Sequence, residues 1–270
     1  MKTGYGFTEF ENLAEFKSWL KKQKVTRTVT RLQVHHMWMP DYSCWAKDNA
    51  LRRQHNTKEF HVNTNHWDTI AQHFSVFPDG HIVTGRSLNK TPIGIRGWNT
   101  NAICVEIYGN FDKGKDKMKD AQKKAVIGLY GELCKKFDLT PSVSTVRPHC
   151  WFTAGGTYLG TYNPYKSAKT CPGTNFWGKG CSKDGFAWFI QDVKNYIDGS
   201  KKEPKEEKSE GIYRVRTDEL NVRKGPGVNF EKTNEVHKGD AFTIVEINGN
   251  WGKLKSGIGW INLSYTEKVK

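Results

Sequence analysis

The chain has 270 residues, of which 36% are hydrophobic and 13% aromatic. This is enough apolar material for a packed core, so intrinsic disorder is excluded outside any linker. Basic side chains outnumber acidic ones by 42 to 28, and the formal charge of +14 predicts attraction to a polyanion without saying which one. No apolar run approaches the roughly 18 residues that span a bilayer, and residues 1–20 lack the apolar stretch of a secretory signal. We therefore expect no membrane insertion and no signal peptide.

The segment from Gly199 to Glu210 divides the chain. It contains no large apolar residue, and its four lysines are balanced by four glutamates, a composition typical of a flexible linker. Residues 1–198 form the larger predicted domain, with 28 basic and 17 acidic side chains and a net charge of +11. Residues 211–270 form the smaller one, with a net charge of +3. The expected affinity for a polyanion therefore belongs mostly to the larger domain.

The first predicted element is an amphipathic helix. Thr8 and Glu11 match a T-x-x-E capping box, and it precedes Leu13, Phe16 and Leu20 at helical spacing. Runs rich in β-branched and aromatic residues then predict strands at 29–37, 74–77, 81–84 and 102–108. Two further helices are predicted at 126–137 and 186–197.

Strands that alternate with helices predict an α/β (α+β) domain with a central mixed sheet flanked by helices. The tail has a different pattern. Short strand-like runs at 243–247, 251–254 and 259–263 are separated by Asn-Gly and Ser-Gly turns. They predict a small all-β barrel.

Three segments of the larger domain offer ligands for a metal ion of borderline softness. His35 and His36 end a predicted strand, His149 follows the second helix, and Cys171 lies in a loop. Two imidazoles and a thiolate suit zinc, and three protein ligands leave a fourth position for water, as in catalytic sites. Adjacent residues of a strand point to opposite faces, so only one of His35 and His36 can face the metal. The intervals are long and irregular, so spacing alone leaves open that Cys171 is an ordinary buried thiol.

An ordered set of motifs resembles the zinc N-acetylmuramoyl-L-alanine amidases of the type 2 amidase and peptidoglycan-recognition group. The resemblance covers about residues 25 to 198 and is specific in combination. The motifs are Val34-His35-His36, His73 to Arg86, Asn101 to Gly109, Arg147-Pro148-His149 and Lys169 to Gly173.

The resemblance implies a role for each matched residue. His35, His149 and Cys171 are the implied zinc ligands, Glu106 the general base, and Lys169 the electrostatic stabiliser of the developing oxyanion. The implied cofactor is Zn²⁺. The implied substrate is the amide that joins the lactyl group of N-acetylmuramic acid to the L-alanine of the stem peptide.

Two features depart from the family pattern. Some members have a catalytic tyrosine directly before the His-Phe pair, where this chain has Gln72, so Glu106 has more to do here. The insert from Cys150 to Ala168 is longer than the few residues common in the family, and we expect it to form a loop at the rim of the cleft. A related hydrolase is the alternative if this insert moves His149 out of reach. We interpret His36 as a packing residue or a neighbour of the ligands, and His73 as a buried structural residue.

The tail is similar to bacterial SH3-like (SH3b) domains. The resemblance is carried by residues 219–227, which end in a Gly-Pro-Gly turn, and by Trp251 and Trp260. In that family the module binds peptidoglycan. Tyr213, Asn221 and Trp251 are the candidate ligand-binding residues, with the alternative that both tryptophans belong to the core.

An amidase tethered to a wall-binding barrel resembles phage endolysins and bacterial autolysins. We expect bacterial peptidoglycan as the partner, in a Gram-positive wall with anionic polymers, and residence in the host cytoplasm until a holin lesion releases the enzyme. A non-catalytic peptidoglycan sensor is the alternative, although such relatives commonly lack the cysteine ligand that Cys171 would supply. A zinc nuclease is suggested by charge alone. The sequence has no helix-turn-helix, RRM or zinc-finger pattern, so we expect no nucleic-acid partner.

Overall fold

The computed structural model describes the chain except for residues 46–48, 200–209, 249 and 270. Its contacts divide it into two compact units, residues 1–201 and 202–270. Most of the predicted linker at 199–210 lies outside the described residues, so its flexibility stays a prediction. The two units are described separately below.

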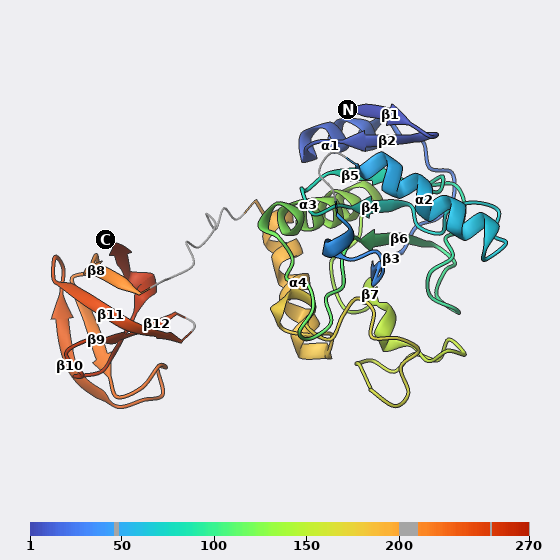
Figure 1. The fold of residues 1–270 in the computed structure, drawn as a ribbon. Helices are drawn as coiled ribbons and strands as arrows, with labels where there is room; N and C mark the ends of the chain where they lie inside the picture. Colours follow the sequence, from blue (N-terminus) through green and yellow to red (C-terminus); the bar gives the residue numbers. More distant parts are fainter. Residues whose placement is uncertain (46–48, 200–209, 249, 270) are drawn as a thin grey trace. The chain divides into compact units, whose positions relative to one another are not determined.

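The first unit is built on a seven-stranded mixed sheet (Figure 1). In spatial order, the strands are β1 (Lys2–Gly4), β2 (Phe7–Phe10), β5 (Ile82–Thr84), β4 (Phe74–Val76), β6 (Ala102–Ile107), β3 (Arg31–His36) and β7 (Val146–Pro148). Strand β3 pairs in parallel with β6 and β7, and β4 pairs in parallel with β6, whereas antiparallel pairs join β1 to β2, β2 to β5 and β5 to β4. This confirms the predicted α/β class.

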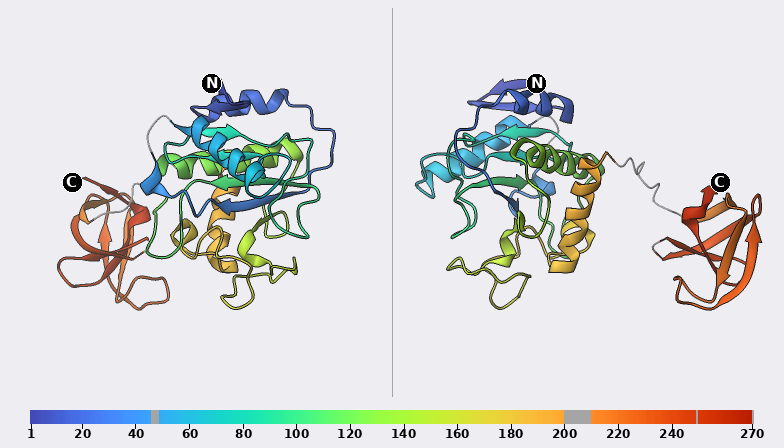
Figure 2. Two further views of the ribbon diagram at one scale, coloured as in Figure 1. Left: turned by 45° about the vertical axis from the view of Figure 1, so that its right-hand side comes forward. Right: turned by 180° about the vertical axis from the view of Figure 1, so that it is seen from behind.

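Helices pack on both faces of this sheet. Three of them share one core with the sheet, and in Figure 2 α3 and α4 run along the same side of it. The fourth, α2, packs against β2 and β5 with a separate small core. The helices are α1 (Leu13–Lys22), α2 (Ala50–Asn63), α3 (Asp120–Phe137) and α4 (Lys183–Ile197), with short 3₁₀ turns η1 (Tyr42–Cys44), η2 (His149–Trp151) and η3 (Phe176–Gly178).

The two faces of strand β3 carry different kinds of side chain. Leu32 and Val34 are fully buried in the core that includes α1, α3 and α4. Because strand side chains alternate between faces, Gln33 and His35 point to the opposite face. That face therefore carries buried polar side chains.

Helix α1 forms as predicted, but the predicted capping box is wrong. Thr8 lies inside β2, where its backbone N–H bonds to another side chain. The cap is Asn12, directly before Leu13, and its Oδ1 accepts a hydrogen bond from the N–H of Glu15 at 3.1 Å. The Glu15 carboxylate returns to the N–H of Glu11 at 3.0 Å. A capping residue must adjoin the first helical turn, and Thr8 is too far upstream.

The second unit is an antiparallel barrel-like sheet around its own apolar core. This agrees with the predicted small all-β domain and adds strands that the sequence patterns had not indicated. In spatial order, its strands are β10 (Lys232–His237), β9 (Glu219–Arg223), β13 (Trp260–Asn262), β12 (Trp251–Leu254), β11 (Ala241–Asn248), β8 (Gly211–Val215) and β14 (Thr266–Lys268), with the turn η4 (Leu263–Tyr265). Among the described residues, no helix has the length and apolar character needed to cross a bilayer.

Candidate metal centre

The carboxyl ends of the parallel strands bring the predicted site residues to one edge of the sheet. His35 lies near the end of β3, and Glu106 is its register partner on β6. His149 directly follows β7, which pairs with β3 on its other side. Parallel strands end at the same edge, where open α/β sheets bind their ligands. The fold thus explains why residues far apart in sequence converge here.

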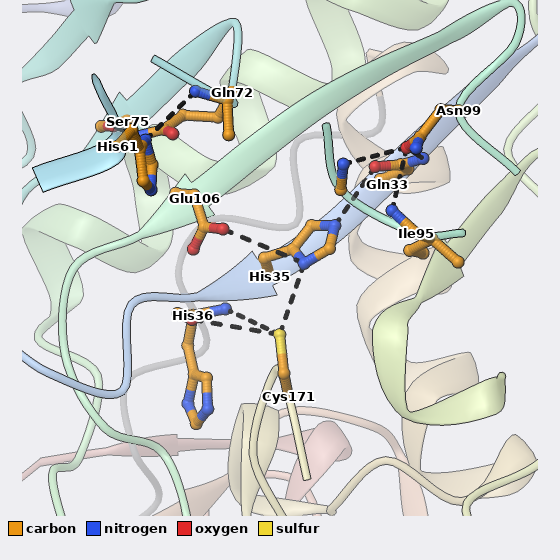
Figure 3. A network of polar contacts seen from close by, with 12 residues as sticks. Gln33, His35, His36, His61, Gln72, Ser75, Ile95, Asn99, Glu106 and Cys171 are labelled. Carbon is orange, nitrogen blue, oxygen red and sulfur yellow. Dashed lines mark hydrogen bonds and ion pairs between the residues drawn. The ribbon is translucent and has the colours of Figure 1, made fainter. Parts of the chain in front are cut away.

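Three side chains gather at this edge in a group able to hold a metal ion. The ligand atoms of His35, His149 and Cys171 all lie within 4.8 Å of one another. The His35 Nδ1 atom is 3.5 Å from the Cys171 Sγ atom, and the two imidazole rings are 5.0 Å apart between centroids. Figure 3 shows Cys171 directed at His35 from a separate loop. These are the three residues that the sequence analysis predicted as ligands, and their binding of a metal stays a prediction.

Backbone contacts hold the Cys171 loop in place. The carbonyl of Cys171 accepts a hydrogen bond from the N–H of Cys150 at 2.6 Å, and the N–H of His36 lies 3.4 Å from the thiol sulfur. Two residues on, Gly173 has φ of +125°, and a β-carbon there would lie 2.3 Å from the carbonyl oxygen of Phe111. A glycine is therefore required for the loop to approach the chain that follows β6.

The donor set fits zinc. Tetrahedral zinc with one nitrogen and one sulfur ligand separates those two atoms by about 3.5 Å, which matches the distance between His35 and Cys171. Burial lowers the pKa of His149 to about 4 and holds that of His35 well below its ordinary value, so both rings are neutral, the form that binds metals. Burial and Glu106 raise the pKa of the Cys171 thiol, so a cation is what would favour the thiolate here.

Glu106 is a largely buried carboxylate beside the ligand group. Its side chain is 21% exposed, and burial raises its pKa to about 8. Its Oε1 lies 3.9 Å from the Nδ1 of His35, whereas Oε2 has no hydrogen-bond partner among the described residues. An unpaired carboxylate oxygen beside the ligand cluster is free to accept a proton.

Lys169 is exposed on the loop that leads to Cys171. Burial raises the pKa of Glu106, and the ammonium of Lys169 partly offsets this rise. The same ammonium lowers the pKa of His149, after the larger effect of burial. The charge of Lys169 thus affects the ligand group and the candidate base, and its role as an electrostatic stabiliser stays a prediction.

The other predicted histidines lie outside the ligand group. The Nδ1 of His36 accepts a hydrogen bond from the N–H of Phe111 at 3.1 Å, so its ring has turned away from Cys171 (Figure 3). His73 is 1% exposed, as predicted. Its Nδ1 accepts from the N–H of Cys104 at 3.0 Å and its Nε2 lies 2.9 Å from the carbonyl of Lys90.

Gln72 occupies the position at which some amidases have a tyrosine. It is fully buried, and its Nε2 donates to the Ser75 hydroxyl at 2.9 Å. Ser75 is the register partner of Glu106, so the Gln72 amide lies near the candidate base (Figure 3).

The insert at 150–168 packs through Phe152 and Tyr158, which lie against each other at 5.3 Å between ring centroids. Its effect on substrate access stays a prediction.

Sequence reasoning missed two residues that contact the site. The Oε1 of Gln33 lies 3.3 Å from the Nε2 of His35, and Asn99 in turn contacts the amide of Gln33. A glutamine in a strand of apolar residues, two positions before a candidate ligand, is the signal that could have indicated the first of them.

The three candidate residues of the tail lie apart. Tyr213 on β8 is 3% exposed and belongs to the core, whereas Asn221 on β9 and Trp251 on β12 are half-buried. One strand separates each of these positions from the next: β13 lies between β9 and β12, and β11 between β12 and β8. Their binding role stays a prediction.

The mixed sheet, with a His-His-Cys group at the carboxyl edge of its parallel strands, defines an α/β domain with a candidate metal site. The chain belongs to the N-acetylmuramoyl-L-alanine amidase family, whose model matches residues 25–174. Residues 218–267 match the bacterial SH3 domain family. Both matches agree with the resemblances found in the sequence.

Individual relatives match smaller parts of the chain. Peptidoglycan-recognition protein 2 of Holotrichia diomphalia is 31% identical over 93 residues, which cover 34% of this chain and 49% of that protein. The N-acetylmuramoyl-L-alanine amidase of Sus scrofa is 28% identical over 80 residues, 30% of this chain and 13% of that protein. The chain thus spans about half or less of the length of these relatives. Among solved structures, the amidase LysC of Clostridium intestinale has 19% identity and a TM-score of 0.43, covering 64% of this chain and 87% of that chain.

Proposed function

We propose that the protein hydrolyses the amide between N-acetylmuramic acid and the L-alanine of the stem peptide in bacterial peptidoglycan. The observation that carries the proposal is the convergence of His35, His149 and Cys171 beside Glu106, in a chain of the amidase family. The proposed cofactor is zinc, held by the two imidazoles and the thiolate. A bound zinc ion supplies a Lewis acid that lowers the pKa of water and polarises a carbonyl oxygen.

The neighbouring side chains supply the proton transfer and the charge. Glu106 takes a proton from the attacking water through a carboxylate oxygen and can return it to the leaving amine of L-alanine. Without a metal, burial raises the pKa of Glu106 to about 8. The charge of a bound cation would lower this pKa and leave the carboxylate able to act as a base near neutral pH. The ammonium of Lys169 stabilises the negative charge that develops on the oxygen of the scissile amide.

The second unit is proposed to hold the enzyme on the wall. Its family match supports the role of an SH3b module, and a tether raises the concentration of enzyme near an insoluble substrate. This is the layout of an endolysin, and a bacterial autolysin would use the same chemistry. The Gram-positive host, release through a holin lesion and the identity of the bound wall component stay predictions.

Product chemistry on purified cell walls tests the proposed reaction. We expect wild type to release the amino group of L-alanine without new reducing sugar ends, and to contain one zinc ion per chain. Cys171→Ser should lose its zinc because a ligand is removed, and its activity should fall by more than about 100-fold. Cys134→Ser is the matched control, since Cys134 is also buried but lies in α3, and it should keep both.

New reducing ends would identify a glycosidase, and amino groups of other residues would identify a different peptidase. A specific observation favours one second candidate, a peptidoglycan sensor without catalysis, because one relative is a peptidoglycan-recognition protein. That candidate predicts that wild type binds walls and releases no amino groups at all.

A further inference from the structure

A buried chain of amides lies behind the candidate ligand His35 (Figure 3). Gln33 is fully buried, and its Oε1 is 3.3 Å from the Nε2 of His35. We propose that Gln33 is a positioning residue that fixes His35 in the tautomer protonated at Nε2, which directs the unprotonated Nδ1 toward Cys171. The inference rests on the proposed zinc site, but not on the identity of the bond that is cleaved.

The orientation of the Gln33 amide follows from its partners. Its Nε2 lies 2.9 Å from the backbone carbonyl of Trp98 and 3.0 Å from the Oδ1 of Asn99. A carbonyl oxygen only accepts hydrogen bonds, so the nitrogen of the amide must face Trp98. The oxygen of the amide therefore faces His35.

Asn99 is oriented by the same logic. Its Oδ1 lies 2.9 Å from the N–H groups of both Gly94 and Ile95. Backbone N–H groups only donate, so Oδ1 is fixed as their acceptor and also accepts from Gln33. The backbone of residues 94–99 thus sets the direction of the whole chain of hydrogen bonds.

The direction of the chain determines the tautomer of His35. The Oε1 of Gln33 can only accept, so the Nε2 of His35 must carry the proton and donate it. Nδ1 then keeps its lone pair, and it is the ring nitrogen that lies 3.5 Å from the Cys171 sulfur and 3.9 Å from Glu106. A metal ligand needs this unprotonated nitrogen on the metal side.

Gly94 gives independent support for the close fit around Gln33. A β-carbon at Gly94 would lie 2.0 Å from the Oε1 of Gln33 and 3.1 Å from the sulfur of Cys104. The loop therefore has no room for a side chain at this position. Gly94→Ala should push the Gln33 oxygen away from His35 without altering the glutamine itself.

Two measurements on the full-length protein test the proposal without using activity. The first is the pair of ¹⁵N chemical shifts of the His35 ring in metal-free protein, which report the tautomer. The second is zinc affinity, measured by competition with a chromogenic chelator. We expect wild type to be protonated at Nε2, and Gln33→Leu to show mixed tautomers and about 10- to 100-fold weaker zinc binding.

Gln122→Leu is the matched control. Gln122 is also fully buried, and its Nε2 donates to the carbonyls of Val76 and Tyr108, away from the ligand group. It should cost a similar amount of stability and leave the His35 tautomer and zinc affinity unchanged.

A proton on Nδ1 in wild type would overturn the proposal, as would unchanged zinc affinity in Gln33→Leu or an equal loss in Gln122→Leu. If Gln33→Leu does not fold, Gly94→Ala decides by the same two measurements. Wall hydrolysis is assayed separately. A correct tautomer in a protein that cleaves another bond would contradict the proposed function and leave this inference standing.

Discussion

Glu106 is a residue whose position is costly unless it has a function. It is an acidic side chain on a strand whose other residues are fully buried, and one of its oxygens has no partner among the described residues. Leaving a polar group unpaired in such a place costs about 1–3 kcal/mol. The cost is understandable if the group must be ready to accept a proton.

Replacing Glu106 by glutamine tests this role. Glu106→Gln preserves size and cannot take up a proton, so we expect kcat on a soluble muropeptide to fall by about 10²- to 10⁴-fold, with zinc content unchanged. Glu132→Gln is the control, because Glu132 is also buried but bonds to Tyr196 on α4. Full activity in Glu106→Gln would show that the base lies elsewhere.

His73 predicts a pH dependence of stability. Burial, with a smaller contribution from Arg27, lowers its pKa to about 3, although the contact with the carbonyl of Lys90 acts in the opposite direction. The unfolded chain, with a histidine pKa of about 6.5, binds one more proton than the folded chain below that pH. Stability is therefore lost as the pH falls from about 6.5 toward 3, by about 1.4 kcal/mol per pH unit for this residue. The free energy of unfolding of the metal-free protein is measured with urea between about pH 7 and pH 5. It should fall less steeply with pH in His73→Gln than in wild type. Equal slopes would mean that His73 is not buried as a neutral ring.

The residues of the candidate site could be predicted to different degrees. His35, His149 and Cys171 have ligand chemistry and family motifs, so the sequence indicated all three. Gln33 and Asn99 are amides without reactivity of their own. Their importance arises from backbone groups of residues 94–99 that face them, and no pattern in the sequence indicates which way a backbone carbonyl points.

At the scale of elements, helix α3 is shaped by two glycines in its interior. A β-carbon at Gly128 would lie 2.2 Å from Leu13 on α1, and one at Gly131 would lie 2.1 Å from the ring of Tyr196 on α4. Glycine normally destabilises a helix by about 1 kcal/mol relative to alanine. Here its absence of a side chain allows two helices to pack closely against a third.

Gly131→Ala should therefore destabilise the protein, against its helix propensity. Crowding of the Tyr196 ring costs about 1–3 kcal/mol and outweighs the propensity gain of about 1 kcal/mol. The free energy of unfolding is measured for Gly131→Ala, Tyr196→Ala and the double variant. Removal of the ring should make the alanine neutral or stabilising. If the loss persists in the double variant, the helix contact is not its cause.

Elements with strong periodicity were predicted and weak ones were not. Strands β3 and β6 and helices α3 and α4 form where continuous apolar patterns indicated them. Helix α2 was missed because only Ala50 and Gln54 of its residues are buried, so it has no apolar stripe. The short strand β1 has no buried residue and was missed for the same reason.

At the scale of the whole molecule, the positive charge gathers close to the proposed active site. Residues 113–124 contain six lysines, and none of the salt bridges between described residues includes them. Asp116 in this segment is turned inward and accepts from the N–H groups of Tyr42 and Asn110. The segment is joined to the loop of Cys171, since the N–H of Lys113 bonds to Thr174 at 2.9 Å.

We expect this segment to attract the anionic polymers of the wall. Lys113, Lys115 and Lys117 are exposed, and their joint replacement by glutamine should weaken wall binding and make it less sensitive to salt. Replacing Lys21, Lys22 and Lys24 by glutamine removes the same charge around the end of α1 and should have a smaller effect. The measurement is enzyme bound to purified walls over roughly a tenfold range of ionic strength. Equal losses in both variants would assign the attraction to net charge alone.

The ligand group also joins the beginning of the amidase unit to its end, because His35 and Cys171 are 136 positions apart. A chain synthesised only to residue 170 lacks the thiol, and unfolding of either segment separates the two side chains, so a metal ion held there would favour the folded amidase unit. Its binding energy then adds directly to the free energy of unfolding. If the proposed zinc is bound, a medium poor in zinc would reduce the stability of the folded unit together with its activity, and the lifetime of the protein would depend on the supply of a trace element.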